Sequence, residues 1–231
     1  MSSRLIKPIP AALAVAAGLL LPGTASAALS VPSPAPAPQP VVQPELKTVL
    51  PIARQELRKR VRERRGNNVP RYRNGKGRVA PYSIRDQWCV AFGTWVWSRA
   101  GFEDYLGTDL IWRAHDGTDV AIQVTDLSRW AQRTAHWSAR AKPGYLVAYD
   151  FSHIGVVERV DRNGRAVKAI EGNKSDRVRR VDVPMRNVTG YISPIELSTG
   201  EVLSSLQRPD MIVPAGIAED PMSVAVSSSG E

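Results

Sequence analysis

The residues of this 231-residue chain that could perform nucleophilic chemistry are few, because it contains one cysteine, Cys89, and three histidines. Cys89 lies in the stretch DQWCVAFGTWVW, whose apolar spacing indicates an amphipathic helix with Asp86 as a favourable N-cap. The thiol then falls in the first helical turn, where unpaired backbone N–H groups and the helix dipole stabilise a thiolate. Cys89 is therefore a candidate nucleophile.

A thiol nucleophile needs a base that takes its proton and a third group that holds this base. His115 and His136 occur in the polar segments RAHDG and TAHWS, which are typical of surface positions. His153 begins the apolar segment HIGVVERV, which has the pattern of a strand. A lone strand histidine is more often structural than catalytic, so its neighbours decide its role.

The neighbouring strand supplies polar partners for His153. The turn between HIGVVERV and AVKAIEGN contains Asn-Gly, a hairpin signal. A three-residue loop, Arg162–Gly164, places Asn173 opposite His153 and Gly155 opposite Glu171. The two partners then share one sheet face with His153. A two-residue loop would shift the register by one and turn Glu171 to the other face.

The elements that must position these residues follow the order helices first, strands later, which indicates the α+β class. Residues 46–64 have apolar positions at spacings of three and four, as a helix would, and residues 66–68 supply its stop. Residues 71–81 have no apolar period and are expected to form a loop. One more helix is expected over 126–135, and strands over 145–149, 153–160, 166–172, 178–183 and 188–192.

Four segments, WCVAFGTWVWSRAG, PGYLVAYD, SHIGVVERV and IEGNKS, resemble in order and spacing the CHAP domain, the cysteine- and histidine-dependent amidohydrolase/peptidase. The resemblance covers Pro51 to Pro194. It implies a papain-like fold, with N-terminal helices packed on an antiparallel β-sheet. It also implies Cys89 as nucleophile, His153 as base, Glu171 as the residue that orients the base, and Asn173 as a fourth polar member.

Two features depart from the family pattern. Gly144-Tyr145 stands where the family commonly has Gly-Asp, which changes a local turn and none of the four site residues. Some relatives bind calcium in an acidic loop before the cysteine, but here that region is GNNVPRYRNGKGR. It lacks the carboxylates that Ca²⁺ requires, so neither a metal nor another cofactor is expected.

Composition divides the chain into segments. Residues 1–27 have the basic start, short apolar run and small-residue cleavage site of a signal peptide, and residues 28–45 are a proline-rich spacer. The catalytic domain is expected over 46–197, beginning with a basic helix, 46–65, and a weakly ordered tail over 198–231. These features predict a secreted, cell-wall-associated monomer without a stable membrane span.

Positive charge is concentrated in one segment. Residues 45–80 contain 12 Lys or Arg against three Glu, whereas the rest of the chain carries 19 basic and 19 acidic residues. Such a segment favours polyanions, although a solvated helix face that aids solubility explains it equally well. For an exported protein, peptidoglycan or another anionic wall polymer is the expected partner.

The resemblance implies hydrolysis of a peptidoglycan amide, either the N-acetylmuramoyl-L-alanine bond or a bond of the stem or cross-bridge peptide. The expected mechanism uses the Cys89 N–H as one oxyanion donor, with Gln87 and Tyr82 as weak candidates for the second. An alternative is a non-catalytic wall-associated scaffold with the same fold. A nucleic-acid binder is not expected, because the basic segment lacks interleaved aromatic residues on which bases stack.

Overall fold

A computed structural model describes residues 44–74 and 77–206 of the chain. The expected signal peptide and nearly all of the expected spacer lie outside these residues, as does the end of the expected tail, 207–231. Within the described residues, no helix combines the length and apolar character needed to cross a membrane.

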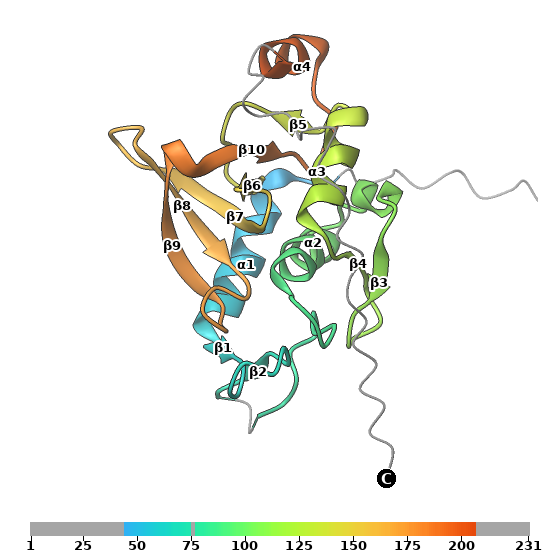
Figure 1. Ribbon diagram of the computed structural model, residues 1–231, viewed down its shortest axis with the longest axis vertical. Coiled ribbons are helices and arrows are strands. Elements are labelled where there is room, and N and C mark those ends of the chain that lie inside the picture. Colours follow the sequence, from blue (N-terminus) through green and yellow to red (C-terminus); the bar gives the residue numbers. More distant parts are fainter. Residues whose placement is uncertain (1–43, 75–76, 207–231) are drawn as a thin grey trace, which may run out of the picture. The chain divides into compact units, whose positions relative to one another are not determined.

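The centre of the structure is a six-stranded antiparallel sheet in the order β5-β10-β6-β7-β8-β9 (Figure 1). Its strands are β5 (Trp137–Ser138), β6 (Leu146–Tyr149), β7 (His153–Val160), β8 (Ala166–Glu171), β9 (Arg179–Pro184) and β10 (Val188–Ile192). The five strands expected from the sequence are all present, with β7 and β10 at the predicted bounds.

The longer helices lie together on one side of this sheet, and the combination of helices with an antiparallel sheet confirms the α+β class (Figure 1). The helices are η1 (Leu46–Thr48), α1 (Val49–Arg58), α2 (Cys89–Arg99), η2 (Asp104–Gly107), α3 (Val124–Arg133), η3 (Met185–Asn187) and α4 (Thr199–Leu206). Two small hairpins complete the fold, β1 (Val61–Arg62) with β2 (Arg71–Tyr72), and β3 (Ile111–Arg113) with β4 (Asp119–Ala121). Whether the arrangement is papain-like stays a prediction.

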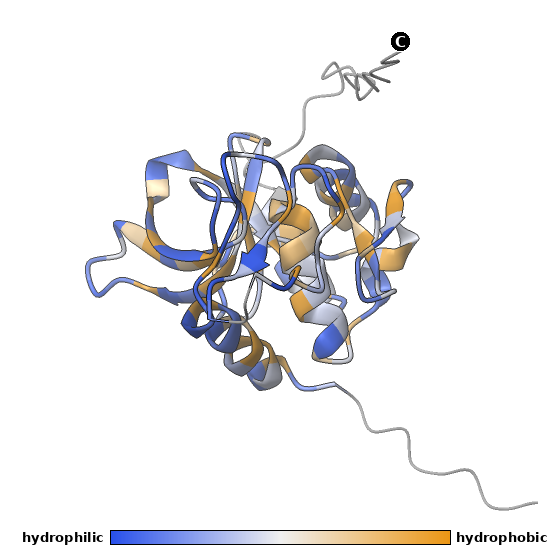
Figure 2. Cartoon of the chain, turned by 90° about the horizontal axis from the view of Figure 1, so that it is seen from below, coloured by the Kyte–Doolittle hydropathy of each residue, from blue (hydrophilic) through white to orange (hydrophobic). Residues whose placement is uncertain are grey.

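Two hydrophobic clusters, one on each side of the sheet, fix the alternation of its strands. Ile154, Val156 and Ile170 belong to the cluster that contains α1, α2 and α3. Val157 and Ala169 belong to the other cluster. Figure 2 shows hydrophobic residues gathered between helices and sheet, and hydrophilic residues along the outer loops. Because side chains alternate along a strand, the faces of His153 and Glu171 are set by this burial.

The register beside the candidate site is the one predicted. Val156 pairs with Ile170, as the three-residue loop required, and continuing this register sets Gly155 opposite Glu171. A Cβ placed on Gly155 would lie 2.5 Å from Cγ of Glu171, so the glycine leaves the space that this side chain fills.

The turn itself differs from the prediction by one residue. Val160 pairs with Val167, which gives a four-residue turn, 162–165. The extra residue is accommodated because the Asp161 carboxylate accepts a hydrogen bond of 2.8 Å from the N–H of the last turn residue. A bulge at Glu158 then shifts the register back before it reaches His153.

The basic helix expected over 46–65 is wrong in its second half. The helix α1 ends at Arg58, and Arg60 has a φ of 54°, in the left-handed region. The chain then enters β1, where Val61 is 1% exposed. A helix continued through Val61 could not pair this residue with β2 and bury its side chain at the same time. The helix therefore ends early. The predicted helix stop at 66–68 is therefore wrong, because the helix has already ended at Arg58. The predicted loop over 71–81 is wrong at its start, which forms β2.

The sequence analysis also missed β3, β4 and β5, which are only two or three residues long, and α4. The helix α4 lies in the segment expected to be a weakly ordered tail. It is held on the domain because Ser205 Oγ accepts a 2.9 Å hydrogen bond from the Ala139 N–H, and Glu201 pairs with Lys142. The tail prediction therefore needs correction for 199–206.

The packing of β10 predicts a strong effect of adding one methyl group. A Cβ at Gly190 would lie 2.1 Å from the Trp137 ring, so Gly190→Ala is expected to lower the free energy of unfolding. Overpacking of this kind costs about 1–3 kcal/mol, measurable by urea denaturation. The control is Gly200→Ala in α4, where nothing lies within 4 Å of the added Cβ. Equal stability of the two variants would contradict the packing described for β10.

Candidate active site

Three strand ends and one helix start meet at one end of the sheet. Tyr149 is the last residue of β6, His153 the first of β7 and Glu171 the last of β8. Cys89 is the first residue of α2, which packs against this end of the sheet. The antiparallel order brings these residues together, although they are far apart in the sequence.

Cys89 begins α2 directly, so the prediction of Asp86 as N-cap is wrong. The capping residue is Trp88, and the Asp86 carboxylate accepts only from the N–H of the next residue, Gln87. Trp88 is fully buried and its indole N–H donates a 2.6 Å hydrogen bond to Glu63. This tertiary contact fixes where the helix starts. Cys89 remains in the first turn, where backbone N–H groups have no partner within the helix.

His153 lies between the thiol and a buried carboxylate. Its Nε2 is 3.2 Å from Oε2 of Glu171, a close ion pair in which the ring N–H is not aligned for a regular hydrogen bond. The His153 side chain is 15% exposed and that of Glu171 is 0% exposed. His153 thus interacts with Glu171 and with Cys89 at the same time.

The charges around His153 control its protonation. Burial lowers the pKa of His153, but its interactions with Cys89 and Glu171 and the negative charge of both groups outweigh burial and raise the pKa to about 9. The imidazole therefore carries its proton at neutral pH. This arrangement can supply a proton to a leaving group beside the thiol.

Tyr149 is a member of the site that the sequence analysis missed. Its hydroxyl donates a 2.7 Å hydrogen bond to Oε2 of Glu171 and accepts one of 3.3 Å from Lys174. Burial, and then the charge of Glu171, raise the pKa of Tyr149, so the hydroxyl stays a donor. Tyr149 pairs directly with His153 across the β6–β7 turn. Pairing these two predicted strands would have revealed it.

Asn173 occupies a different place from the one predicted. It follows β8 with a φ of 57°, and its side-chain amide donates to the carbonyl oxygen of the Gln87 side chain. Asn173 therefore contacts the loop before Cys89, whereas His153 is held by Glu171. The structure brings Cys89, His153 and Glu171 into one cluster and sets Asn173 beside it.

The two candidate oxyanion donors and the other two histidines differ in their exposure to solvent. Tyr82 is fully buried in an aromatic cluster, so it is not available as an oxyanion donor, whereas Gln87 is exposed next to Asn173. His136 is only 6% exposed and packs on Trp130, which corrects the expectation of a surface residue. His115 is exposed, as expected.

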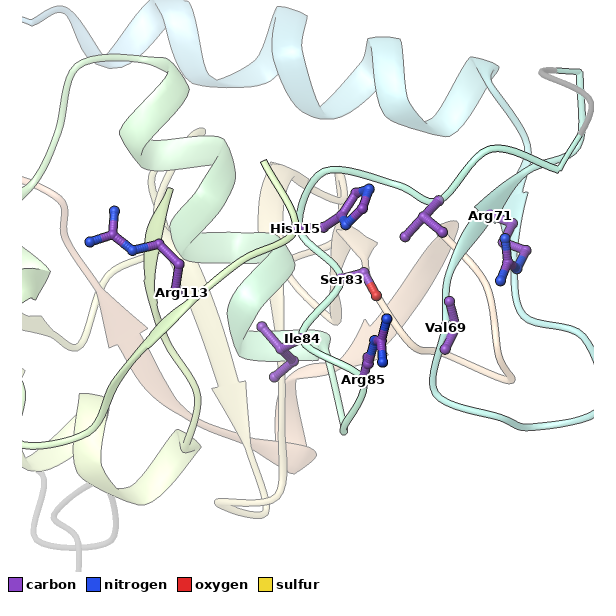
Figure 3. A pocket seen from close by; sticks show the side chains of 8 residues that line it. Val69, Arg71, Ser83, Ile84, Arg85, Arg113 and His115 are labelled. Atoms are coloured by element: carbon purple, nitrogen blue, oxygen red, sulfur yellow. The ribbon is translucent and has the colours of Figure 1, made fainter. Parts of the chain in front are cut away.

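A hollow of about 310 Å³ lies beside the loop that leads to Cys89. The Ser83 hydroxyl lines it and is buried without a hydrogen-bond partner. Arg85 and His115 line it too, while the head group of Arg113 turns away from them (Figure 3). The hollow is completed by Val69, Arg71, Val79 and Ile84. A buried hydroxyl and an exposed guanidinium are groups that bind a carboxylate.

Among the described residues, no three His, Cys, Asp or Glu side chains gather as a metal site requires. Comparison with protein families matches residues 81–173 to the model of the CHAP domain. The matched range contains Cys89, His153, Glu171 and Asn173. No curated protein and no solved structure matches the chain.

The role of Glu171 in the protonation of His153 is testable by NMR titration of the histidine ring. Glu171→Gln removes a negative charge that raises the pKa of His153, so this pKa is expected to fall by about one unit or more. Gly155→Ala, which displaces the Glu171 side chain, is expected to lower it in the same direction. Arg162→Gln, in the exposed β7–β8 turn, serves as control. An unchanged pKa in Glu171→Gln would show that the carboxylate does not govern the imidazole.

Proposed function

Since residues 81–173 are a CHAP domain, we propose that this protein is a secreted, cell-wall-associated hydrolase that cleaves an amide bond of peptidoglycan by a thiol mechanism. The observation that carries the proposal is the placement of His153 between Cys89 and the buried Glu171. A nucleophile, a base and a group that orients the base are the parts that such chemistry needs.

Cys89 acts as the nucleophile and His153 as the proton carrier. In the reactive state the thiol proton resides on the imidazole, and the thiolate sulfur attacks the amide carbonyl carbon to form a tetrahedral intermediate. The imidazolium then donates its proton to the leaving nitrogen, the C–N bond breaks, and a thioester remains on Cys89. His153 next takes a proton from water, whose oxygen attacks the thioester and releases the carboxylic acid and the thiol.

We assign the stabilisation of the oxyanion of the intermediate to two groups. The backbone N–H of Cys89 belongs to the first turn of α2, where it has no intrahelical partner. The Gln87 side chain accepts from Asn173 through its oxygen, which leaves its amide N–H₂ as a donor. Asn173 accordingly acts as a positioning residue for Gln87 in this mechanism.

The hollow beside the loop supports an acidic substrate. Stem peptides of peptidoglycan carry free carboxylates, and Arg85 has no acidic partner among the described residues. The buried Ser83 hydroxyl offers a second donor. We assign to Arg85 and Ser83 the binding of a stem-peptide carboxylate close to the scissile amide.

The proposed reaction is tested with purified sacculi and mass spectrometry of the released fragments. The unaltered protein is expected to release fragments whose new amino termini identify the cleaved bond. Cys89→Ala removes the attacking atom, so release is expected to fall by at least about a thousandfold. If neither protein released fragments and both bound sacculi equally, the non-catalytic scaffold would replace the hydrolase.

The assignment of Arg85 is tested by kinetics on a soluble muropeptide. Arg85→Gln removes a charged hydrogen bond to the substrate, so KM is expected to rise about tenfold or more with little change in kcat. Arg162→Gln changes the net charge equally at the distant β7–β8 turn and is expected to leave KM unchanged. The same small effect in both variants would remove Arg85 from substrate binding.

A further inference from the structure

A second hollow, of about 370 Å³, is walled by arginines and shares no lining residue with the hollow at Ser83. It lies where β1 meets the chain just before β9, two segments that Figure 1 draws side by side. We call it the arginine pocket, defined by Arg60, Arg62, Arg73, Arg177, Arg179 and Arg180. Leu57, Val61 and Val178 form the rest of its lining.

Backbone pairing holds these arginines together. The Val178 N–H donates a 3.0 Å hydrogen bond to the Val61 carbonyl, next to a bridge in which Arg62 lies directly opposite Arg177. On its other side, Arg62 lies directly opposite Arg71 in the β1–β2 hairpin. Three arginines therefore stand in a row across adjacent strands, an arrangement in which like charges destabilise the sheet.

The acidic groups nearby compensate only part of this charge. Glu158 is bound by Arg180 and by Arg54, which accounts for Arg180. The side chain of Arg177 donates to the backbone oxygen of Ser175, and that of Arg179 donates to the Ser175 hydroxyl. Asp176 is close by, with its carboxylate 3.8 Å from the position of a Cβ on Gly66.

The other three arginines of the pocket, Arg60, Arg62 and Arg73, have no acidic partner within 44–74 and 77–206. All three are exposed. The fold thus maintains like-charge repulsion around an open hollow, which an anion bound there would relieve.

We infer that the arginine pocket binds the phosphate groups of a linear anionic polymer of the cell envelope. A phosphate offers several acceptor oxygens to more than one guanidinium fork at once, and arginine matches its geometry with two parallel hydrogen bonds. The arginines at the edge of the pocket, which belong to β1 and to the start of β9, are exposed to solvent. A chain of phosphates can therefore continue beyond the hollow.

The surroundings of the pocket favour a flexible polymer over two other polyanions. Single-stranded nucleic acid is bound through exposed aromatic rings, but Tyr72 is 6% exposed and is covered by Lys59 and Arg78. A membrane surface is bound through apolar side chains inserted beside the charges. The large exposed hydrophobic residues of the described chain all lie elsewhere, between Leu106 and Trp112 and at Val160, Ile195 and Leu203.

The pocket adjoins the segments that build the candidate active site. Glu63, the residue after Arg62, bonds the indole N–H of Trp88, which caps the helix of Cys89. The loop that follows Glu171 leads directly to Arg177. A polymer held in the pocket therefore anchors the protein close to the site, and this binding does not depend on hydrolysis.

The test is a fluorescence-anisotropy titration of the full chain with labelled inorganic polyphosphate. The unaltered protein is expected to bind with an affinity that falls as salt rises. Arg62→Gln/Arg177→Gln is expected to weaken binding at least about tenfold, which is 1.4 kcal/mol. Its melting temperature is expected to match or exceed that of the unaltered protein, because repulsion is removed. A variant that melts lower is replaced by Arg60→Gln/Arg73→Gln, which lies outside the β1 bridge.

The matched control is Arg162→Gln/Arg186→Gln, two exposed arginines away from the pocket with the same change in net charge. It is expected to bind polyphosphate as the unaltered protein does. Absence of binding, or equal loss in both double variants, would overturn the pocket. Stronger pocket-dependent binding to oligothymidylate, polyglutamate or vesicles of anionic phospholipid would overturn the choice of a phosphate polymer. The Cys89→Ala protein must give the same titration, which separates this result from the fate of the proposed hydrolase.

Discussion

The candidate site depends on how the wholly buried carboxylate of Glu171 is held. A charge in such a place is costly unless partners compensate it, and here Tyr149 donates to one oxygen while His153 lies against the same atom. The opposite sheet position is a glycine, Gly155, because any larger residue would take the volume of the Glu171 side chain. The need to hold this buried carboxylate thus links the strand register, the glycine at position 155 and the protonation of His153.

Other buried acids tie the basic N-terminal segment to the rest of the domain. Glu56 lies under Lys59 and Tyr72, Glu63 accepts from the Trp88 indole, and Glu158 is bound by arginines from α1 and β9. Each of these carboxylates is 6% exposed or less. The positive segment is therefore built into the fold through a few buried acids, and its surplus arginines stay at the surface.

The β1–β2 hairpin contributes one strand to each arginine-lined hollow, since Arg62 lines one hollow and its strand partner Arg71 lines the other. One hollow adjoins the loop before Cys89 and is the one proposed to bind a carboxylate of the substrate. The other is lined by more arginines and is the one proposed to hold an anchoring polymer.

The amino-acid sequence by itself determined the class of the fold, the strands around His153 and the choice of Cys89, His153 and Glu171, because alternation, helix periodicity and rare reactive side chains are local signals. The bulge at Glu158 shows the limit, since the turn was one residue longer than predicted and the register survived only through this compensation. Only the tertiary structure decided that Trp88 starts the helix and that Tyr149 holds Glu171. It also decided that Asn173 bonds Gln87 and that Arg62 meets Arg177. Each of these depends on packing between segments far apart in the chain, where burial and hydrogen bonding outweigh local propensity.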